Sequence, residues 1–365
     1  MIIIDYLKEY NIMKIAFCKF AGMGNGGIEK YLQSIAMLYK KNGHEIDYYY
    51  TNAAPLLYQQ WQHPDNNEYR IKLMQNNSIN LIPINVEVRI RNEWINSNFF
   101  EKFDEKKYDI LITAGNGESE YPYNRLSTIP IIHTVHGDHP FNQQNIKKSV
   151  LLCKWQANRW ISRGGDISKL EIIPPIVNVP DKWNSNFRKK YNIPENAFVY
   201  GLHQRNDNSI SSDISLKAFS TIQNDNIYYA MLGGTEVHKS FVKNNNIKNV
   251  IFAEYTANVE DIHDFLDSIN VYAHCRVDGE VCSASIIEAM YHGKPVISYP
   301  GVNMGHEEQL ENCGKMTYSL EEYIEEMLKL QNKDYYGEMS EKIKNKYKSN
   351  YDYKFVEEKI KQLLI

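Results

Sequence analysis

Short apolar stretches alternate with helical patterns along most of the chain, and this alternation limits the possible folds more than any other feature. The apolar stretches have the length and composition of strands and include residues 14–18, 46–50, 110–112, 198–201, 227–232 and 271–273. Patterns of amphipathic helices stand between several of them, as at 28–38 and 214–222. Strands that alternate with helices favour parallel sheets with crossover connections, so the sequence predicts an α/β fold.

A proline-rich segment divides this pattern into two halves. Residues 172–180 contain Pro174, Pro175 and Pro180, and such residues forbid a helix and favour an extended connection. A chain of 365 residues is also long enough for two domains, each with its own core. We therefore predict a first domain over residues 13–178 and a second over residues 190–348.

Composition and charge exclude several classes of protein. Hydrophobic residues make up 43% and charged residues 24% of the chain, as in ordinary globular proteins. A formal net charge of −4 does not suit a general nucleic-acid binder. The five cysteines are scattered without a CxxC spacing, which indicates reduced thiols and an intracellular compartment.

The sequence shows no apolar run of membrane-spanning length, and its beginning does not look like a signal peptide. The first twelve residues contain Asp5, Lys8 and Glu9, and Met13 follows as a second candidate start site. We expect a cytoplasmic protein.

The stretch from Glu280 to Gly293 carries the strongest functional signal. Gly293 is typical of the end of a helix, and Pro295 opens a strand after it, so the helix is predicted to begin near Ser283, Ala284 or Ser285. A helix start leaves free backbone N–H groups that suit a phosphate. Glu280 stands in the loop just before this helix.

Glu288 lies about one turn inside that helix, and helical side chains lean toward the N-terminus. Two carboxylates therefore flank the predicted phosphate site, and carboxylates bind hydroxyl groups well. A phosphate beside two hydroxyl-binding carboxylates suits a nucleotide sugar.

This stretch resembles the E-x7-E signature of retaining GT-B glycosyltransferases, specifically of the large family four. Glu280 and Glu288 keep the spacing of that signature, and Gly293-Lys294-Pro295 continues it. Val281 and Ser283 stand where that family usually has glycine. The resemblance implies two Rossmann-like parallel-sheet domains that face each other across a cleft.

The resemblance extends over most of the chain. It includes a first strand with a glycine turn, a GHEV-like element, a TVHG element and an IPNGV-like linker, which are residues 14–29, 43–46, 134–137 and 173–177. It implies that Gly26 and Gly27 contact the donor phosphate or the acceptor. It also implies that His136 lies beside the donor sugar, so that Glu280 and His136 are the catalytic residues. The apolar spacing also predicts a last amphipathic helix over residues 351–364, whose apolar side consists of Phe355, Val356, Ile360, Leu363 and Leu364. The resemblance implies that residues 351–365 complete the first domain.

Two arginines are candidates for binding the donor diphosphate. Arg205 follows the strand at 198–201, where a guanidinium can bind a diphosphate in a bidentate manner. The resembled family usually has a lysine a few residues later, but residues 208–212 contain none. Arg276 precedes Glu280 in the same loop and is the candidate for supplying the missing charge.

Three other patterns suggest other functions. Residues 22–27 match the G-x-G-x-x-G pattern of dinucleotide sites. Such a site needs an acidic residue after the second strand to bind the ribose, and none follows the strand at 46–50.

His133, His136 and His139 recur at every third residue and could suggest zinc. Gly137 and Pro140 interrupt any regular element that could bring the three rings together around the metal. A basic, aromatic stretch over residues 147–163 could contact a membrane surface or could be an ordinary solvated helix.

The sequence features predict a glycosyltransferase of glycan biosynthesis with no cofactor, and the resemblance implies that it is of the retaining, metal-independent type. The donor is expected to be a nucleoside diphosphate sugar bound mainly by the second domain. The acceptor, a glycan, a lipid or a lipid-linked molecule, is expected on the first domain, and peripheral membrane contact is a further expectation. Two alternatives remain: a nucleotide-sugar epimerase on the same fold, and a non-catalytic sugar-nucleotide-binding subunit.

Overall fold

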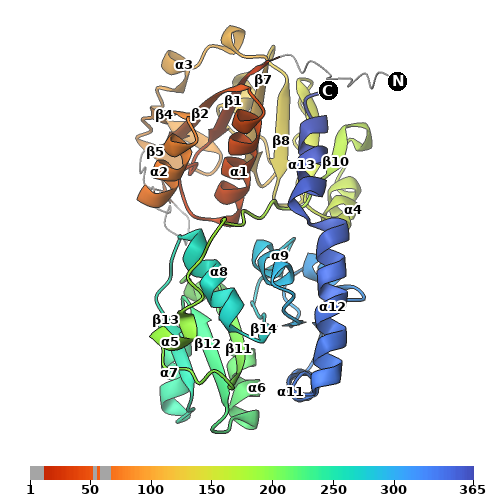
Figure 1. Cartoon of the computed structure of the whole chain (residues 1–365). Helices are drawn as coiled ribbons and strands as arrows, with labels where there is room; N and C mark the ends of the chain where they lie inside the picture. Colours follow the sequence, from red (N-terminus) through yellow and green to blue (C-terminus); the bar gives the residue numbers. More distant parts are fainter. Residues whose placement is uncertain (1–11, 52–55, 58–66) are drawn as a thin grey trace, which may run out of the picture. The chain divides into compact units, whose positions relative to one another are not determined.

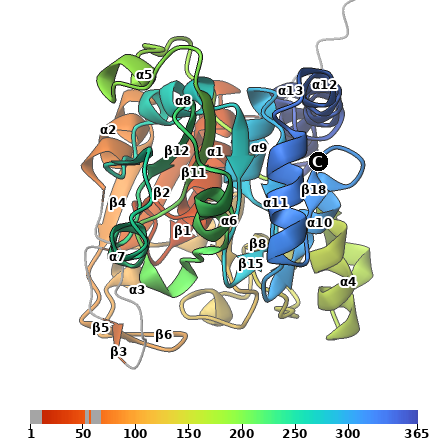
Figure 2. The ribbon, with the colours of Figure 1, turned by 90° about the horizontal axis from the view of Figure 1, so that it is seen from below.

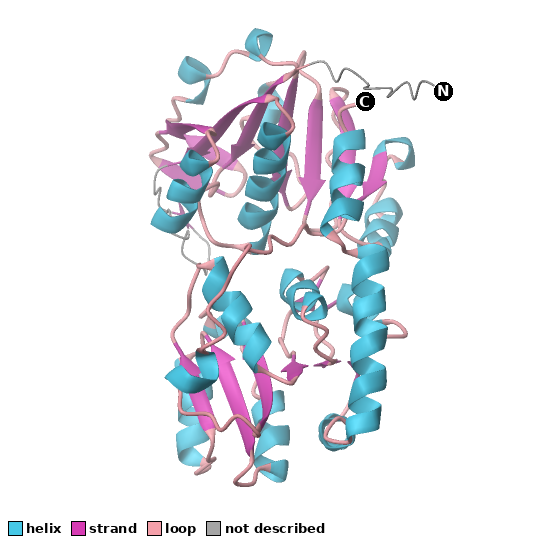
Figure 3. Ribbon diagram, viewed as in Figure 1, coloured by secondary structure: helices cyan, strands magenta, loops and turns pink. Residues whose placement is uncertain are grey.

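A computed structural model describes residues 12–51, 56–57 and 67–365 of the chain. The chain divides into two compact units, of which the first contains residues up to 134 together with 141–149. The second contains residues 135–140 and 150–365. Helices and strands alternate in both units (Figures 1 and 3), which confirms the predicted α/β class. The predicted domains, 13–178 and 190–348 with 351–365 added to the first, stay a prediction.

The larger sheet has seven strands in the order β10-β9-β8-β7-β1-β2-β4. These strands are β1 (Lys14–Lys19), β2 (Glu45–Thr51), β4 (Asn80–Ile84), β7 (Ile110–Gly115), β8 (Ile131–Val135), β9 (Ile146–Leu151) and β10 (Leu170–Ile172). The pairs β1–β2, β1–β7 and β2–β4 are parallel. Ile15, Ala16 and Phe17 are fully buried, because a central strand of a parallel sheet is covered on both faces.

The helices of the first unit are α1 (Gly27–Lys41), α2 (Glu68–Asn76) and α3 (Phe99–Lys102). Both α1 and the strands beside it fall where the apolar pattern predicts them. Asn67 accepts a hydrogen bond from the backbone N–H of Arg70 and so caps α2, a helix that the sequence analysis did not predict.

A small additional sheet in the first unit was also missed. Its strands are β3 (Leu56–Leu57), β5 (Val88–Ile90) and β6 (Glu93–Ile95), in the order β3-β5-β6. The antiparallel pair β5–β6 brings Arg89 opposite Trp94. Strands of two or three residues are too short to show an apolar run or a regular alternation, so no sequence pattern marks them.

The second sheet has six strands in the order β13-β12-β11-β14-β16-β18. They are β11 (Phe198–His203), β12 (Ile227–Leu232), β13 (Val250–Ala253), β14 (Val271–Ala273), β16 (Val296–Ser298) and β18 (Lys315–Met316). The paired strands are parallel throughout this sheet. Figure 2 views the same ribbon from below.

The helices of the second unit are α4 (Lys154–Ser162), α5 (Phe187–Lys190), α6 (Ile214–Ile222), α7 (Glu236–Asn244), α8 (Val259–Ser268), α9 (Ala284–Tyr291), α10 (Gly305–Leu310), α11 (Leu320–Lys329), α12 (Lys333–Asn350) and α13 (Tyr353–Gln362). A separate pair of short strands, β15 (Gly279–Glu280) and β17 (Asn303–Met304), accompanies them.

The last helix differs from its prediction in one apolar residue. Val356, Ile360 and Leu363 are buried, as the pattern predicts. Phe355 was placed on the same apolar side but is 40% exposed. It is one position, or about 100°, from Val356 on the helix, so its ring points away from the buried stripe and lies beside the ammonium group of Lys359 instead.

No helix in the described part of the chain is long and apolar enough to cross a membrane.

Candidate active site

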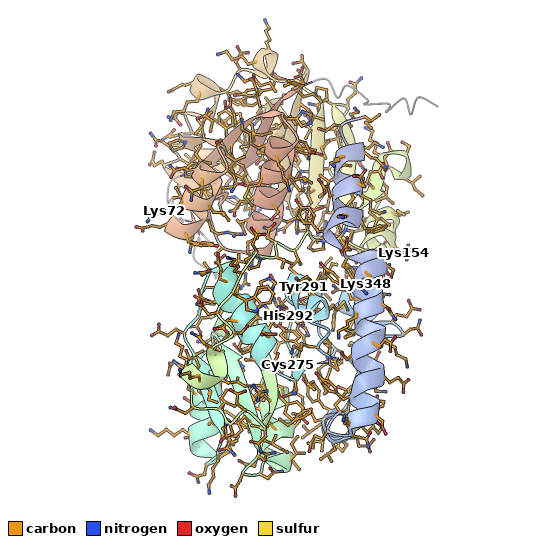
Figure 4. The ribbon with its side chains drawn as sticks, viewed as in Figure 1. Lys72, Lys154, Cys275, Tyr291, His292 and Lys348 are labelled. Carbon is orange, nitrogen blue, oxygen red and sulfur yellow. The ribbon has the colours of Figure 1, made fainter. Side chains whose placement is uncertain are left out.

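Helix α9 begins where the sequence predicts it. Ser283 is its N-cap, and the Oγ of Ser283 accepts a hydrogen bond from the backbone N–H of Ile286 at 3.4 Å. The helix ends before Gly293, whose φ of +64° suits glycine and places its N–H on the carbonyl of Met290. Figure 4 labels Tyr291 and His292 at this end of α9.

Hydrogen bonds from α10 fix the N-terminus of α9 but leave part of its backbone available to a ligand. Gln309 of α10 accepts a hydrogen bond from Ser283 N–H at 2.7 Å and donates one to Ser283 O at 3.1 Å. Among the described residues, the backbone N–H groups of Ala284 and Ser285 have no hydrogen-bonding partner. Free N–H groups at the positive end of a helix favour an anion such as a phosphate.

Glu280 stands before this helix in the short strand β15, and not in a loop as predicted. Strand β15 pairs in parallel with β17, and Glu280 lies opposite Met304. Gly279 makes the pairing possible, because its φ is +64° and a Cβ there would collide with the carbonyl of Asn303. The backbone of Glu280 is therefore fixed by sheet hydrogen bonding.

Basic groups surround the Glu280 carboxylate. Its Oε1 lies 3.1 Å from Arg276 Nη1 and 3.6 Å from His274 Nε2. The ring of His306 stands 3.4 Å from the backbone carbonyl of Glu280. Burial alone would raise the pKa of Glu280, but the charge of Arg276, with a smaller contribution from the nearby ring of His274, outweighs burial and lowers the pKa to about 2. Glu280 is thus a carboxylate at any physiological pH.

Glu288 lies in the middle of α9 with its side chain largely buried. Its Oε2 is 2.7 Å from Nε2 of His203, the last residue of β11. Both side chains are close to nine-tenths buried. The pair brings a carboxylate to the carboxyl end of a parallel strand, where ligands bind in α/β sheets.

The two predicted diphosphate-binding arginines differ in their surroundings. Arg205 is half exposed, and its Nε lies 3.1 Å from Asp207. Arg276 is largely buried and binds Asp278 through Nε at 2.9 Å and Nη2 at 2.6 Å, besides its contact with Glu280. Arg205 can turn toward a ligand at little cost, whereas Arg276 mainly fixes the acidic loop before α9.

His136 follows β8 in a loop that α4 holds. Gln156 of α4 is fully buried and donates to the carbonyls of Val135 and Gly137, on either side of His136. Cys153, the N-cap of α4, lies 3.1 Å from the carbonyl of Val281 through its Sγ. Helix α4 therefore contacts both the His136 loop and the backbone next to Glu280 within the second unit.

Gly26 and Gly27 lie in the first unit at the start of α1. Gly26 is the N-cap, and Gly27 is the first helical residue. The carboxylate of Glu29 occupies the space beside Gly26 and is paired with Lys19 at 3.1 Å. A phosphate at this helix start would lie close to the negative charge of Glu29. The predicted contact of these glycines with a phosphate therefore requires the positive charge of Lys19 to compensate that of Glu29.

Sequence reasoning missed three histidines around the two glutamates. His203 contacts Glu288, His274 faces Glu280, and His306 contacts the Glu280 backbone. His203 ends β11 and His274 directly follows β14. A rule that inspects polar residues at the carboxyl ends of predicted parallel strands would have found these two. Nothing in the sequence marks His306.

Metal and dinucleotide sites were both disfavoured from the sequence. In the ranges 12–51 and 67–365, no group of three or more His, Cys, Asp or Glu side chains is placed to hold a metal ion. His133 is buried in β8 beside Thr113, whereas His139 is a half-buried neighbour of Asp138 and Arg163.

Solved structures identify the fold. HepE from Anabaena, solved with UDP and glucose, is 16% identical with a TM-score of 0.73, over 96% of this chain and 99% of that chain. A glycosyltransferase from Rickettsia africae is 16% identical with a TM-score of 0.74, over 97% and 98%. Sucrose-phosphate synthase from Thermosynechococcus elongatus is 13% identical with a TM-score of 0.69, over 96% and 98%. The chain has the GT-B fold, as the resemblance implied.

The enzyme class follows from the second unit. Residues 184–349 match the family described as glycosyl transferases group 1. This region contains α9, with Glu280 before it and Glu288 within it. The chain is a glycosyltransferase, and the class predicted from the sequence is confirmed. A search of curated proteins gave no significant match.

The depressed pKa of Glu280 predicts a pH-dependent contribution to stability. The folded-state pKa of about 2 lies below the usual 4.5, so the stabilisation is fully present above pH 4.5 and is lost as the pH falls toward 2. At neutral pH this stabilisation contributes about 3 kcal/mol to the free energy of unfolding. Urea unfolding of the wild type and Glu280→Gln should show a larger difference in the free energy of unfolding at pH 7 than at pH 3. Equal differences at the two pH values would contradict the prediction.

Proposed function

We propose that this glycosyltransferase uses a nucleoside diphosphate sugar and retains the configuration of the sugar. The observation that carries the proposal is the start of α9, where the backbone N–H groups of Ala284 and Ser285 have no partner among the described residues. In the sequence these two residues lie between Glu280 and Glu288, whose carboxylates are both largely buried. The helix start suits the diphosphate. The carboxylates of Glu280 and Glu288 suit hydroxyl groups of the sugar and of the ribose.

The two glutamates take different roles in this proposal. Glu288, fixed by His203, binds the ribose, which does not change during transfer. Glu280, held ionised by Arg276 and His274, faces the sugar, which gains positive charge as the leaving group departs. His136 lies beside the sugar as the second catalytic residue, and Arg205 binds the diphosphate.

The chemical step needs no cofactor in this proposal. The bond between the sugar C1 and the diphosphate oxygen breaks, and a bond from C1 to the acceptor oxygen forms on the same face. The proton of the acceptor hydroxyl passes to the departing diphosphate oxygen. The chain supplies positioning and stabilisation of the leaving diphosphate through the helix start and Arg205.

The proposal also names a class of donor and a class of acceptor. UDP-sugars are the first donors to test, because HepE was solved with UDP-glucose. The acceptor is a glycan or a lipid-linked molecule, and peripheral membrane contact through α4 belongs to the same proposal. In α4 the guanidinium of Arg159 stacks on Trp155 at 5.0 Å and pairs with Asp138. Lys154, labelled in Figure 4, is exposed at the start of this helix.

Donor binding and metal independence can be tested together. Isothermal titration calorimetry with UDP, GDP and their sugars should show micromolar to millimolar binding of at least one nucleotide, and donor turnover should persist in excess EDTA. The reason is that a helix start and an arginine, and not a cation, neutralise the diphosphate. A complete loss of turnover in EDTA that Mg²⁺ restores would contradict metal independence. Absence of nucleotide binding would overturn the proposed function.

A further inference from the structure

The first unit contains buried polar groups around Gly115 that the donor site does not use. Gly115 is the last residue of β7, and Lys19 ends the neighbouring parallel strand β1. His133 lies in β8, on the other side of β7. These groups therefore lie toward the carboxyl edge of the sheet, where α/β sheets bind ligands.

Because Gly115 has no side chain, it leaves room for one further carbon atom, and we call this place the Gly115 gap. A Cβ at Gly115 would be 3.5 Å from Oε2 of Glu120 and 3.6 and 3.9 Å from Cε1 and Nε2 of His133. Among the described residues no other heavy atom comes closer, so a methyl-sized group fits there without strain. One carboxylate oxygen and one imidazole nitrogen border the same gap.

The nitrogen that borders the gap has no partner in the described part of the chain. His133 is 1% exposed, and its Nε2 forms no hydrogen bond. The ring is fixed by Thr113, whose hydroxyl lies 2.6 Å from Nδ1. Burial, followed by the charge of Lys19, lowers the pKa of His133 to about 4, so the ring is neutral. A buried polar atom without a hydrogen-bonding partner costs folding free energy. This indicates that a ligand or a water molecule forms a hydrogen bond with Nε2 of His133.

Glu120 presents its second oxygen to the gap. Its Oε1 accepts hydrogen bonds from Arg89 at 2.8 Å and from the indole N–H of Trp94 at 3.1 Å. Its Oε2 has no hydrogen bond among the described residues. The small β5–β6 hairpin, which supplies Arg89 and Trp94, thus holds this carboxylate with one oxygen free for a ligand.

The charges around the gap favour a neutral ligand. Arg89 is paired with Glu120, and Lys19 is paired with Glu29 at 3.1 Å. Neither cation near the gap is left without a carboxylate, and the free oxygen of Glu120 would repel a phosphate or a carboxylate. A hydroxyl group can donate to Glu120 Oε2 and also bond His133 Nε2, whichever tautomer the ring adopts.

We infer that the Gly115 gap is a subsite for a hydroxyl group of a neutral sugar, and that this sugar belongs to the acceptor. The inference rests on the proposed function, because only a glycosyl acceptor needs a second sugar-binding site. It deepens that function by assigning Glu120 and His133 as acceptor-binding residues and by naming an uncharged glycoside as the acceptor class.

Binding can be tested without knowledge of the acceptor. Methyl glycosides of glucose, galactose, mannose and N-acetylglucosamine, at millimolar concentration, serve as probes in saturation-transfer difference NMR on the full chain. At least one should receive saturation from the wild type. Gly115→Ala places a methyl group in the gap, and Glu120→Gln removes the charge that a hydroxyl donates to. Each should weaken binding of that glycoside about tenfold.

Gly337→Ala is the matched control, because a Cβ there meets no atom within 4 Å. It should bind the glycoside as the wild type does. Circular dichroism and calorimetry with UDP should be unchanged in Gly115→Ala, since the added methyl group causes no clash. An unchanged glycoside signal in Gly115→Ala means that only water occupies the gap, and the inference is then wrong.

The other outcomes separate this inference from the proposed function. UDP binding without any glycoside signal in the wild type would overturn the inference and leave the donor assignment intact. A glycoside signal that Gly115→Ala abolishes, in a protein that binds no nucleotide, would support the sugar subsite and contradict the donor assignment. If a phosphorylated glycoside bound more tightly than the uncharged glycosides, the assignment of an uncharged glycoside as the acceptor class would be wrong.

Discussion

Glu280→Gln is expected to lower the turnover rate by about 10²–10³-fold while it changes the affinity for the bare nucleoside diphosphate little. The substitution keeps the size of the side chain and removes a charge that Arg276 and His274 hold ionised. If Glu280 faces the sugar, its charge matters most when positive charge develops on the sugar during transfer. The measurement is steady-state kinetics at saturating donor, with calorimetry of the nucleoside diphosphate on the same variant.

Asp278→Asn is the matched control for this experiment. Asp278 also binds Arg276, through Nε and Nη2, but it stands two residues further than Glu280 from α9 in the sequence. If the loss in Glu280→Gln came only from releasing Arg276, Asp278→Asn would show a similar loss. Comparable turnover in Glu280→Gln and the wild type, together with weakened nucleotide binding, would reverse the roles proposed for the two glutamates.

Glu288→Ala is expected to weaken the binding of nucleoside diphosphate and of nucleotide sugar alike, by about ten- to hundredfold. This range corresponds to the loss of charge-assisted hydrogen bonds of about 1.5–3 kcal/mol. The ribose is common to both ligands, so the two losses should be equal within error. Calorimetry with UDP and UDP-glucose gives both affinities.

Two further variants help to interpret that result. Glu325→Ala removes a carboxylate that is 68% exposed on α11 and should bind both ligands normally. His203→Gln removes the imidazole that holds Glu288 Oε2 but leaves the carboxylate, so it should weaken binding less than Glu288→Ala does. Unchanged affinities in Glu288→Ala would remove Glu288 from the site.

Regular elements of the fold were predictable because their patterns are long. Helix α6 and strand β12 occupy the predicted residues 214–222 and 227–232. The start of α9 was also predictable, because Ser283 and Gly293 mark its two ends. Local signals suffice for such elements, since caps and apolar spacing depend on neighbours in the sequence.

What escaped prediction depends on contacts distant in sequence. Strand β15 exists only because residues 303–304 pair with it, and Glu280 was therefore expected in a loop. His306 reaches the Glu280 backbone from α10, 26 positions away. The Glu120–Arg89–Trp94 group likewise joins residues that no local spacing connects. Periodicity cannot reveal such contacts, because they arise from tertiary packing.

The pairing of β15 with β17 also limits how this enzyme can be re-engineered. Side chains have no room at Gly279, Gly301 or Gly305, where a Cβ would meet Asn303, the backbone of Gly279, or the carbonyl of Val281. A library that randomises these positions would mostly return unfolded or displaced loops. Val277 and Val302 are 50% and 80% exposed beside the same strands. Diversity introduced at these two valines can alter the surface around Glu280 while its backbone stays in place.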